Sequence, residues 1–82
     1  MEIIKYATKS CVKCQVLDRI LKGMTLPCDV KTLYVEDEGI ESFENEGIDS
    51  MPTLKIKNND KEKVIVGLTS PEQINIAIQE VQ

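Results

Sequence analysis

The chain has 82 residues, of which 41% are hydrophobic and 29% are charged, and its formal net charge is −4. This length allows one domain, spanning residues 1–82, and the apolar content is too high for a disordered chain. The sequence contains no histidine, which excludes histidine-based catalysis and most zinc sites, and its acidic balance argues against non-specific binding of nucleic acid.

Strand and helix patterns alternate along the chain. Short segments rich in apolar, β-branched or aromatic residues predict four strands, over residues 2–7, 29–36, 53–57 and 64–66. Apolar residues at helical spacing predict three helices, over residues 11–24, over residues 40–46 and from residue 71 onward. This order, β-α-β-α-β-β-α, predicts an α/β fold with a mixed four-stranded sheet and helices on both faces.

Several residues mark the ends and the buried faces of these helices. Ser10 is the expected N-cap of the first helix, and Ser70, followed by a proline, is the expected N-cap of the last. The apolar stripe of the first helix is expected to include Val12. In the short middle helix, Ile40 and Phe43 are the expected buried anchors.

Two of the three cysteines form a Cys-x-x-Cys motif where the first strand passes into the first helix. The spacing brings the sulfurs of Cys11 and Cys14 close enough to bond, and the helix N-terminus stabilises a thiolate at Cys11. Lys9 and Lys13 add positive charge on either side. Because a thiolate is the nucleophile of thiol–disulfide exchange, the motif predicts a redox dithiol in which Cys11 attacks and Cys14 resolves the mixed disulfide.

Other interpretations of these residues stay open. The motif could supply half of a zinc site shared with a partner, or its cysteines could be inert. Cys28, just before the second predicted strand, is most simply a partly buried small hydrophobe, and the alternative is a regulatory or dimer-forming thiol. The acidic stretch 36–46 is most simply a solvated face, and the alternative is a docking surface for a basic partner.

Taken together, four segments of the sequence resemble the thioredoxin superfamily, in the right order and over nearly the whole chain. These segments are Cys-Val-Lys-Cys at 11–14, Tyr-Val-Glu-Asp-Glu at 34–38, Glu-Gly-Ile-Asp-Ser-Met-Pro-Thr-Leu at 46–54 and Val-Gly at 66–67. The resemblance implies a thioredoxin-like fold in a chain of glutaredoxin size. It also implies a protein-disulfide oxidoreductase with a redox-active Cys11–Cys14 disulfide and no tightly bound cofactor.

The resemblance also implies where a substrate binds. It implies that the Met51–Pro52 peptide bond is cis and faces the cysteines, and that the backbone there pairs with an extended substrate segment. We expect Lys13 to be a further substrate contact. The superfamily carries a buried acid at the position that corresponds here to Lys5. Lysines at such positions more often extend to solvent, and the alternative is that Lys5 lies near Cys14 and stabilises its thiolate.

The expected partners follow from this chemistry. The substrates are disulfide-containing proteins, and the electrons come from a flavin-dependent thioredoxin reductase or from glutathione. No apolar run is long enough to cross a membrane and no signal peptide is apparent, so we expect a cytoplasmic monomer that binds neither membrane nor nucleic acid. The alternatives are a glutathione-coupled reductase, a redox-inactive binding module, and metal delivery with ligands from a partner.

Overall fold

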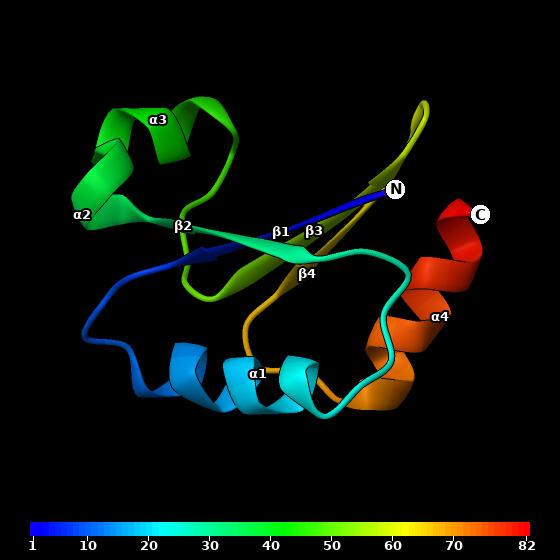
Figure 1. The fold of residues 1–82 in the computed structure, drawn as a ribbon. Helices are drawn as coiled ribbons and strands as arrows, with labels where there is room; N and C mark the ends of the chain where they lie inside the picture. Colours follow the sequence, from blue (N-terminus) through cyan, green and yellow to red (C-terminus); the bar gives the residue numbers. More distant parts are fainter.

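A computed structural model describes residues 1–82, and four strands in it form one mixed sheet (Figure 1). The strands are β1 (Glu2–Ala7), β2 (Val30–Tyr34), β3 (Thr53–Asn58) and β4 (Lys61–Val66). The helices are α1 (Val12–Lys22), α2 (Val35–Glu38), α3 (Ile40–Asn45) and α4 (Pro71–Val81). The predicted α/β fold with helices on both faces of a four-stranded sheet is confirmed.

The strand order across the sheet is β2-β1-β3-β4. β1 runs parallel to β2, with Ala7 opposite Tyr34, and antiparallel to β3, with Tyr6 opposite Thr53. β3 and β4 form an antiparallel hairpin that turns at Asn59, which has a positive φ of 58°. This register places the C-terminal end of β1 and the start of β3 at the same end of the sheet.

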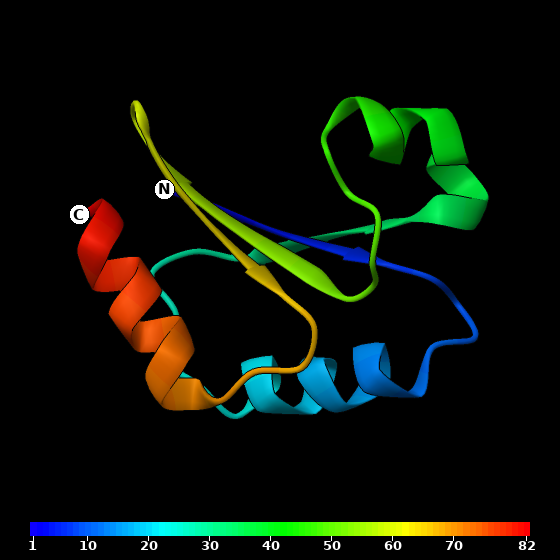
Figure 2. The ribbon, with the colours of Figure 1, turned by 180° about the vertical axis from the view of Figure 1, so that it is seen from behind.

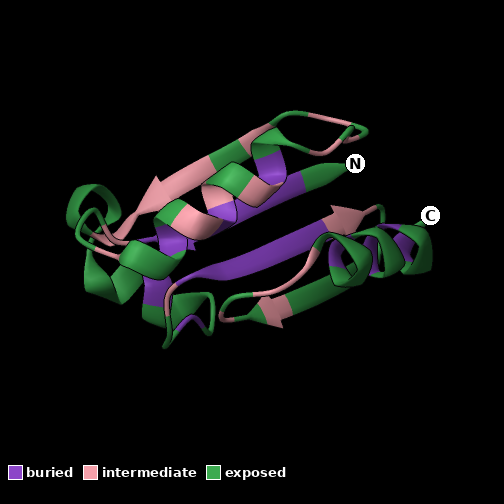
Figure 3. Cartoon of the chain, turned by 90° about the horizontal axis from the view of Figure 1, so that it is seen from below, coloured by how far each residue is buried: buried purple, intermediate pink, exposed green.

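Helices cover both faces of the sheet, as the view from behind also shows (Figure 2). One face packs against α1 and α4 in a core centred on Leu17, Ile56 and Ile74. The other face packs Tyr6 against Phe43 of α3, and their rings meet edge to face with centroids 5.2 Å apart. The central strands β1 and β3 are therefore largely buried, whereas β4 is mostly exposed (Figure 3).

Two buried anchors were predicted wrongly, and helix geometry explains both. The side chain of Val12 is 71% exposed because it lies two residues before Cys14, which places it about 200° around α1 from the face that meets the sheet. Ile40 is 57% exposed because the six-residue helix α3 presents one side chain, Phe43, to the sheet.

The boundaries of two strands also differ from the prediction, for reasons of pairing. β2 ends at Tyr34 instead of residue 36 because Tyr34 pairs with Ala7, the last residue of β1, and the chain then turns into α2. β4 begins at Lys61 instead of residue 64, since backbone pairing with β3 extends through a charged edge segment that carries no apolar signal.

The last helix begins as predicted. The Ser70 hydroxyl accepts a hydrogen bond from the backbone N–H of Gln73 at 3.3 Å, and Pro71 occupies the first turn. Three turns of α4 then bury Ile74, Ile78 and Val81. None of the four helices has the length and apolar content that crossing a membrane requires.

Candidate active site

Cys11 itself begins helix α1. Its backbone is extended, with φ −91° and ψ 115°, and its Sγ accepts a hydrogen bond from the backbone N–H of Cys14 at 3.1 Å. The prediction of Ser10 as N-cap is therefore wrong by one residue. The helix begins at Val12, so the side chain able to reach the N–H of the third helical residue is that of Cys11. The sulfur of the motif's first cysteine is half-buried at the helix tip and close to free backbone donors.

Cys14 lies one turn deeper than Cys11, and its residue is 3% exposed. Burial raises the pKa of the Cys14 thiol to about 11, and the hydrogen bond with Cys11 acts in the same direction. A hydrogen bond from the Thr8 backbone and the charge of Lys5 act in the opposite direction on this pKa. The two cysteines are free thiols in this structure and differ strongly in their access to solvent.

A cavity of about 160 Å³ adjoins both cysteines. Its lining comes from β1, the following loop, α1 and the end of β2, namely Lys5, Thr8, Lys9, Cys11, Cys14, Gln15, Asp18 and Tyr34. Polar and ionisable side chains therefore surround the motif on this side. The predicted substrate residue Lys13 is exposed on the first turn of α1 and does not line this cavity.

Lys5 is buried, which overturns the expectation that it extends to solvent. The residue is 1% exposed, and its ammonium forms an ion pair with the carboxylate of Asp18. Sequence reasoning missed Asp18 as a residue of this site. A signal was available, since Asp18 follows Cys14 by four residues and therefore lies on the same face of α1.

The loop that precedes Cys11 is held by the acidic turn α2. The Glu36 carboxylate accepts hydrogen bonds from the Thr8 hydroxyl and from the Lys9 backbone N–H, the latter at 3.1 Å to each oxygen. The Lys9 ammonium pairs with Asp37 at 3.0 Å and lies over the Tyr34 ring. These acids are exposed, as predicted for a solvated stretch, but two of them also fix the loop that carries the motif.

A glutamine at position 36 should weaken this loop contact in a pH-dependent way. The Thr8 hydroxyl bond, with bonds to backbone N–H groups, lowers the pKa of Glu36 below its usual 4.5. The ionised carboxylate therefore stabilises the fold above pH 4.5, and this contribution disappears as the pH falls through the lowered pKa. We expect Glu36→Gln to lower the melting temperature at about pH 7, and we expect this gap to be smaller in a second measurement made well below pH 4.5.

The matched control for this measurement is Glu38→Gln, an exposed acid in the same turn. Its melting temperature should follow that of the unmodified chain at both pH values. A gap for Glu36→Gln that stays the same at both pH values would contradict the loop contact as its cause.

The Met51–Pro52 peptide bond is cis, and Pro52 is buried. The Pro52 carbonyl accepts a hydrogen bond from the Gly67 N–H at 2.8 Å, and the Thr53 hydroxyl donates to the Ser50 carbonyl at 2.7 Å. Because Thr53 pairs with Tyr6, this segment lies at the same end of the sheet as the loop that leads from β1 to Cys11. The substrate contacts assigned to Met51 and Pro52 stay a prediction.

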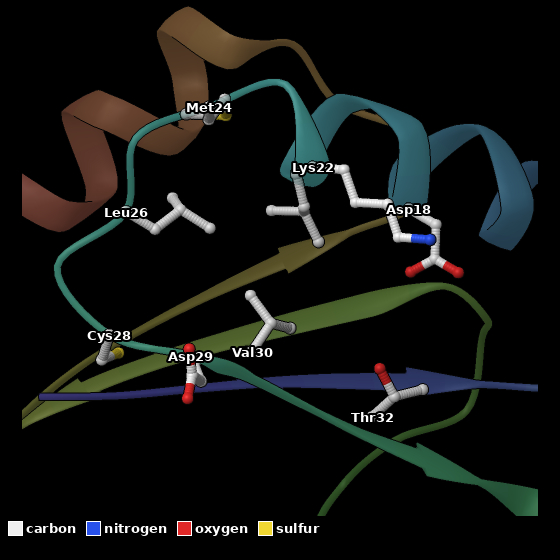
Figure 4. Close-up of a pocket in the computed structure, with 9 residues that line it drawn as sticks. Asp18, Lys22, Met24, Leu26, Cys28, Asp29, Val30 and Thr32 are labelled. Atoms are coloured by element: carbon white, nitrogen blue, oxygen red, sulfur yellow. The ribbon is translucent and has the colours of Figure 1, made fainter.

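Cys28 lies away from the motif, in a different surface depression. It is half-buried and lines a groove of about 400 Å³ between α1 and β2, together with Met24, Leu26 and Val30 (Figure 4). Asp18 also lines this groove, so it borders both cavities. No three Cys, Asp or Glu side chains come together anywhere in the chain in an arrangement that could hold a metal ion.

Comparisons with known proteins agree with this architecture. Reduced desulfothioredoxin from Desulfovibrio vulgaris Hildenborough matches with a TM-score of 0.77 at 18% identity, over 98% of this chain and 80% of that chain. Thioredoxin O2 from Arabidopsis thaliana, in its oxidised state, matches with a TM-score of 0.75 at 17% identity, over 99% and 75% of the two chains. The chain has a thioredoxin fold.

A third thioredoxin, from Plasmodium falciparum, matches with a TM-score of 0.73 at 22% identity, over 99% of this chain and 85% of that chain. No described protein family and no curated protein matches the sequence itself. The thioredoxin fold expected from the sequence is thus confirmed by structure, and the cysteine motif lies at the N-terminus of the helix that follows the first strand.

Proposed function

We propose that this protein is a thiol–disulfide oxidoreductase that reduces protein disulfides through Cys11 and Cys14. The observation that carries the proposal is the arrangement at the start of α1. Cys11 is half-buried at the cap position, Cys14 is buried one turn deeper, and the Cys14 N–H donates to the Cys11 Sγ. One accessible sulfur and one sheltered sulfur on adjacent turns suit attack on a substrate followed by intramolecular resolution.

The proposed reaction has two exchange steps. The Cys11 thiolate attacks one sulfur of the substrate disulfide, so that a Cys11–substrate bond forms and the first substrate thiolate leaves. The Cys14 thiolate then attacks the Cys11 sulfur, which forms the Cys11–Cys14 disulfide and releases the second substrate thiolate. Two electrons pass from the protein to the substrate. The backbone N–H of Cys14, which donates to the Cys11 Sγ, and the helix dipole favour negative charge on the attacking sulfur.

The remaining parts of the proposal concern partners. Met51 and Pro52 would pair with an extended substrate segment, and the exposed Lys13 would contact it from α1. A flavin-dependent thioredoxin reductase or glutathione would return the protein to its dithiol form. The cytoplasm, where thiols are kept reduced, is the proposed location because net reduction needs such a supply of electrons.

The test is whether Cys11 and Cys14 form a reversible disulfide. The protein would be equilibrated in defined thiol buffers, its free thiols alkylated, and the products counted by mass. We expect both thiols to be lost together and recovered on reduction. A midpoint near about −270 mV would indicate a thioredoxin-like donor, and one near about −200 mV would indicate coupling to glutathione.

Two substitutions make this test specific. Cys11→Ser should abolish both the disulfide and the reduction of a protein disulfide such as that of insulin, because the attacking sulfur is gone. Cys28→Ser should retain both, since Cys28 lies in the separate groove. If no buffer produced a Cys11–Cys14 disulfide, the oxidoreductase proposal would fail and a redox-inactive binding module would take its place.

A further inference from the structure

A second ion pair with a buried lysine lies on the α3 face of the sheet, opposite the face that α1 covers. Lys55 of β3 and Glu46, the C-cap residue of α3, are 3.2 Å apart between Nζ and Oε2. The Lys55 side chain is 6% exposed and that of Glu46 is 54% exposed. Burying an ammonium group is costly even when it is paired, and an apolar residue of similar volume often serves stability as well. This pair therefore calls for an explanation other than stability.

Lys55 stays an ammonium in spite of its burial, and it contacts more than Glu46. Burial acts to lower the pKa of Lys55, but the hydrogen bond to Glu46 and the nearby negative charges together outweigh it, so this pKa is raised. The ammonium also lies over the Tyr6 ring, 5.5 Å from its centroid, and Tyr6 in turn meets Phe43 edge to face. Lys55 therefore joins β3 to β1 as well as to the end of α3.

The ion pair closes the base of the loop that carries the proposed substrate segment, Met51–Pro52. This loop leaves α3 after Asn45 and enters β3 at Thr53 (Figure 2), and the two paired residues lie on either side of the substrate segment in the chain. Within the loop, the Thr53 hydroxyl donates a hydrogen bond to the Ser50 carbonyl at 2.7 Å. The loop is thus held at its base by opposite charges and further along by a neutral hydrogen bond, which together restrict where the substrate segment lies.

We propose that this ion pair holds the substrate segment where an extended substrate bound to it reaches Cys11. The inference rests on the thiol–disulfide function proposed above, and Lys55 and Glu46 are positioning residues in it, since neither touches the substrate. Tyr6, under the Lys55 ammonium, belongs to the strand that leads to Cys11, so the pair fixes the substrate segment relative to that strand. A misplacement of about 1 Å can slow a reaction by about 100-fold, which gives such a device a kinetic role.

The test compares an extended substrate with a small one, in chains that all carry Cys28→Ser. Insulin has a peptide backbone that can pair with the substrate segment, whereas 5,5′-dithiobis(2-nitrobenzoate) has none. With dithiothreitol as the reductant, we expect Lys55→Met to raise the KM for insulin by about 10-fold and to change kcat by less than about twofold, because the pair takes no part in the chemical steps. The rate at which Cys11 releases the first coloured thiolate from the small disulfide should stay within about twofold of normal.

The carboxylate partner supplies a second variant. Glu46→Gln leaves the Lys55 ammonium buried without its counter-charge, so the KM for insulin should rise at least as far as in Lys55→Met. The double variant should behave like Lys55→Met alone, because the two substitutions remove one shared interaction. A double variant in which the two separate increases in KM multiply would overturn the inference, since the two side chains would then act independently.

Two matched controls separate positioning from stability. Lys63→Met removes a different ion pair, the one that joins β4 to Glu80 of α4 at 2.6 Å. Ile4→Val trims a buried side chain that is the register partner of Lys55 on β1 and belongs to the same core cluster as Tyr6. Ile4→Val should lower the melting temperature, and both controls should leave the KM for insulin unchanged.

The outcomes separate this inference from the function on which it rests. A KM for insulin within about twofold of normal in Lys55→Met would overturn the inference and leave a purely structural ion pair. An equal slowing with the small disulfide, or an equal rise in KM for Ile4→Val, would overturn it too, since the effect would then come from lost stability. A parent chain that neither reduces insulin nor forms a Cys11–Cys14 disulfide would instead refute the oxidoreductase function itself.

Discussion

Replacing Cys14 with serine is expected to stop the reaction at the mixed disulfide. Cys11 keeps its position at the helix tip and still attacks, but no second sulfur lies one turn deeper to displace the substrate. Multiple-turnover reduction of a protein disulfide should fall by about 100-fold or more, and a covalent adduct with one substrate molecule should accumulate. The rate and the intact mass of the adduct are the two measurements.

The control for this experiment is Cys28→Ser, which removes the thiol in the groove between α1 and β2. It should turn over normally and trap nothing. Dithiothreitol should also reduce the mixed disulfide of the Cys14 variant and release the substrate from it. Undiminished turnover by Cys14→Ser would show that another thiol resolves the intermediate.

Replacing Phe43 with alanine is expected to cause the largest loss of stability of any single substitution on the α3 face. Phe43 is 1% exposed and stacks edge to face with Tyr6 in a core cluster of four buried residues. Removing a buried phenylalanine costs about 3–5 kcal/mol. Because a chain of this length has a total free energy of unfolding of only about 4–12 kcal/mol, the variant should be marginal at room temperature. Urea denaturation followed by circular dichroism measures the loss.

The control within the same helix is Ile40→Ala. This side chain is 57% exposed, so its removal should change the free energy of unfolding by less than about 0.5 kcal/mol. The sequence alone predicted both residues as anchors, and the pair of variants therefore also tests the correction. A loss of less than about 1 kcal/mol for Phe43→Ala would show that the face under α3 relaxes to fill the space.

Local signals account for the parts of the fold that the sequence predicted correctly. The start of α4 depends on Ser70 and Pro71, which act within one turn of the helix. The buried stripe of that helix follows from the spacing of Ile74, Ile78 and Val81. The order of strands and helices follows from changes in periodicity that can be recognised in short windows.

The errors and omissions share a different physical origin. Ser10 was predicted as the N-cap of α1, but the N-cap is Cys11. The start of this helix depends on the loop between β1 and α1, which is held against α2 by the hydrogen bond from the Lys9 N–H to Glu36. The burial of Lys5 was not predicted because a lysine has enough methylene length to reach solvent from most strand positions. Its carboxylate partner lies thirteen residues away, on another element.

By itself the sequence determined the class of fold and the position of the cysteine motif at the start of the first helix, because periodicity and capping are local. Only the tertiary structure decided which charged groups surround that motif. It placed Lys5 of β1 against Asp18 of α1, and Glu36 of α2 against the loop before Cys11. Such contacts join elements far apart in the chain, and they exist only once the packing of helices on the sheet has set the distances between them.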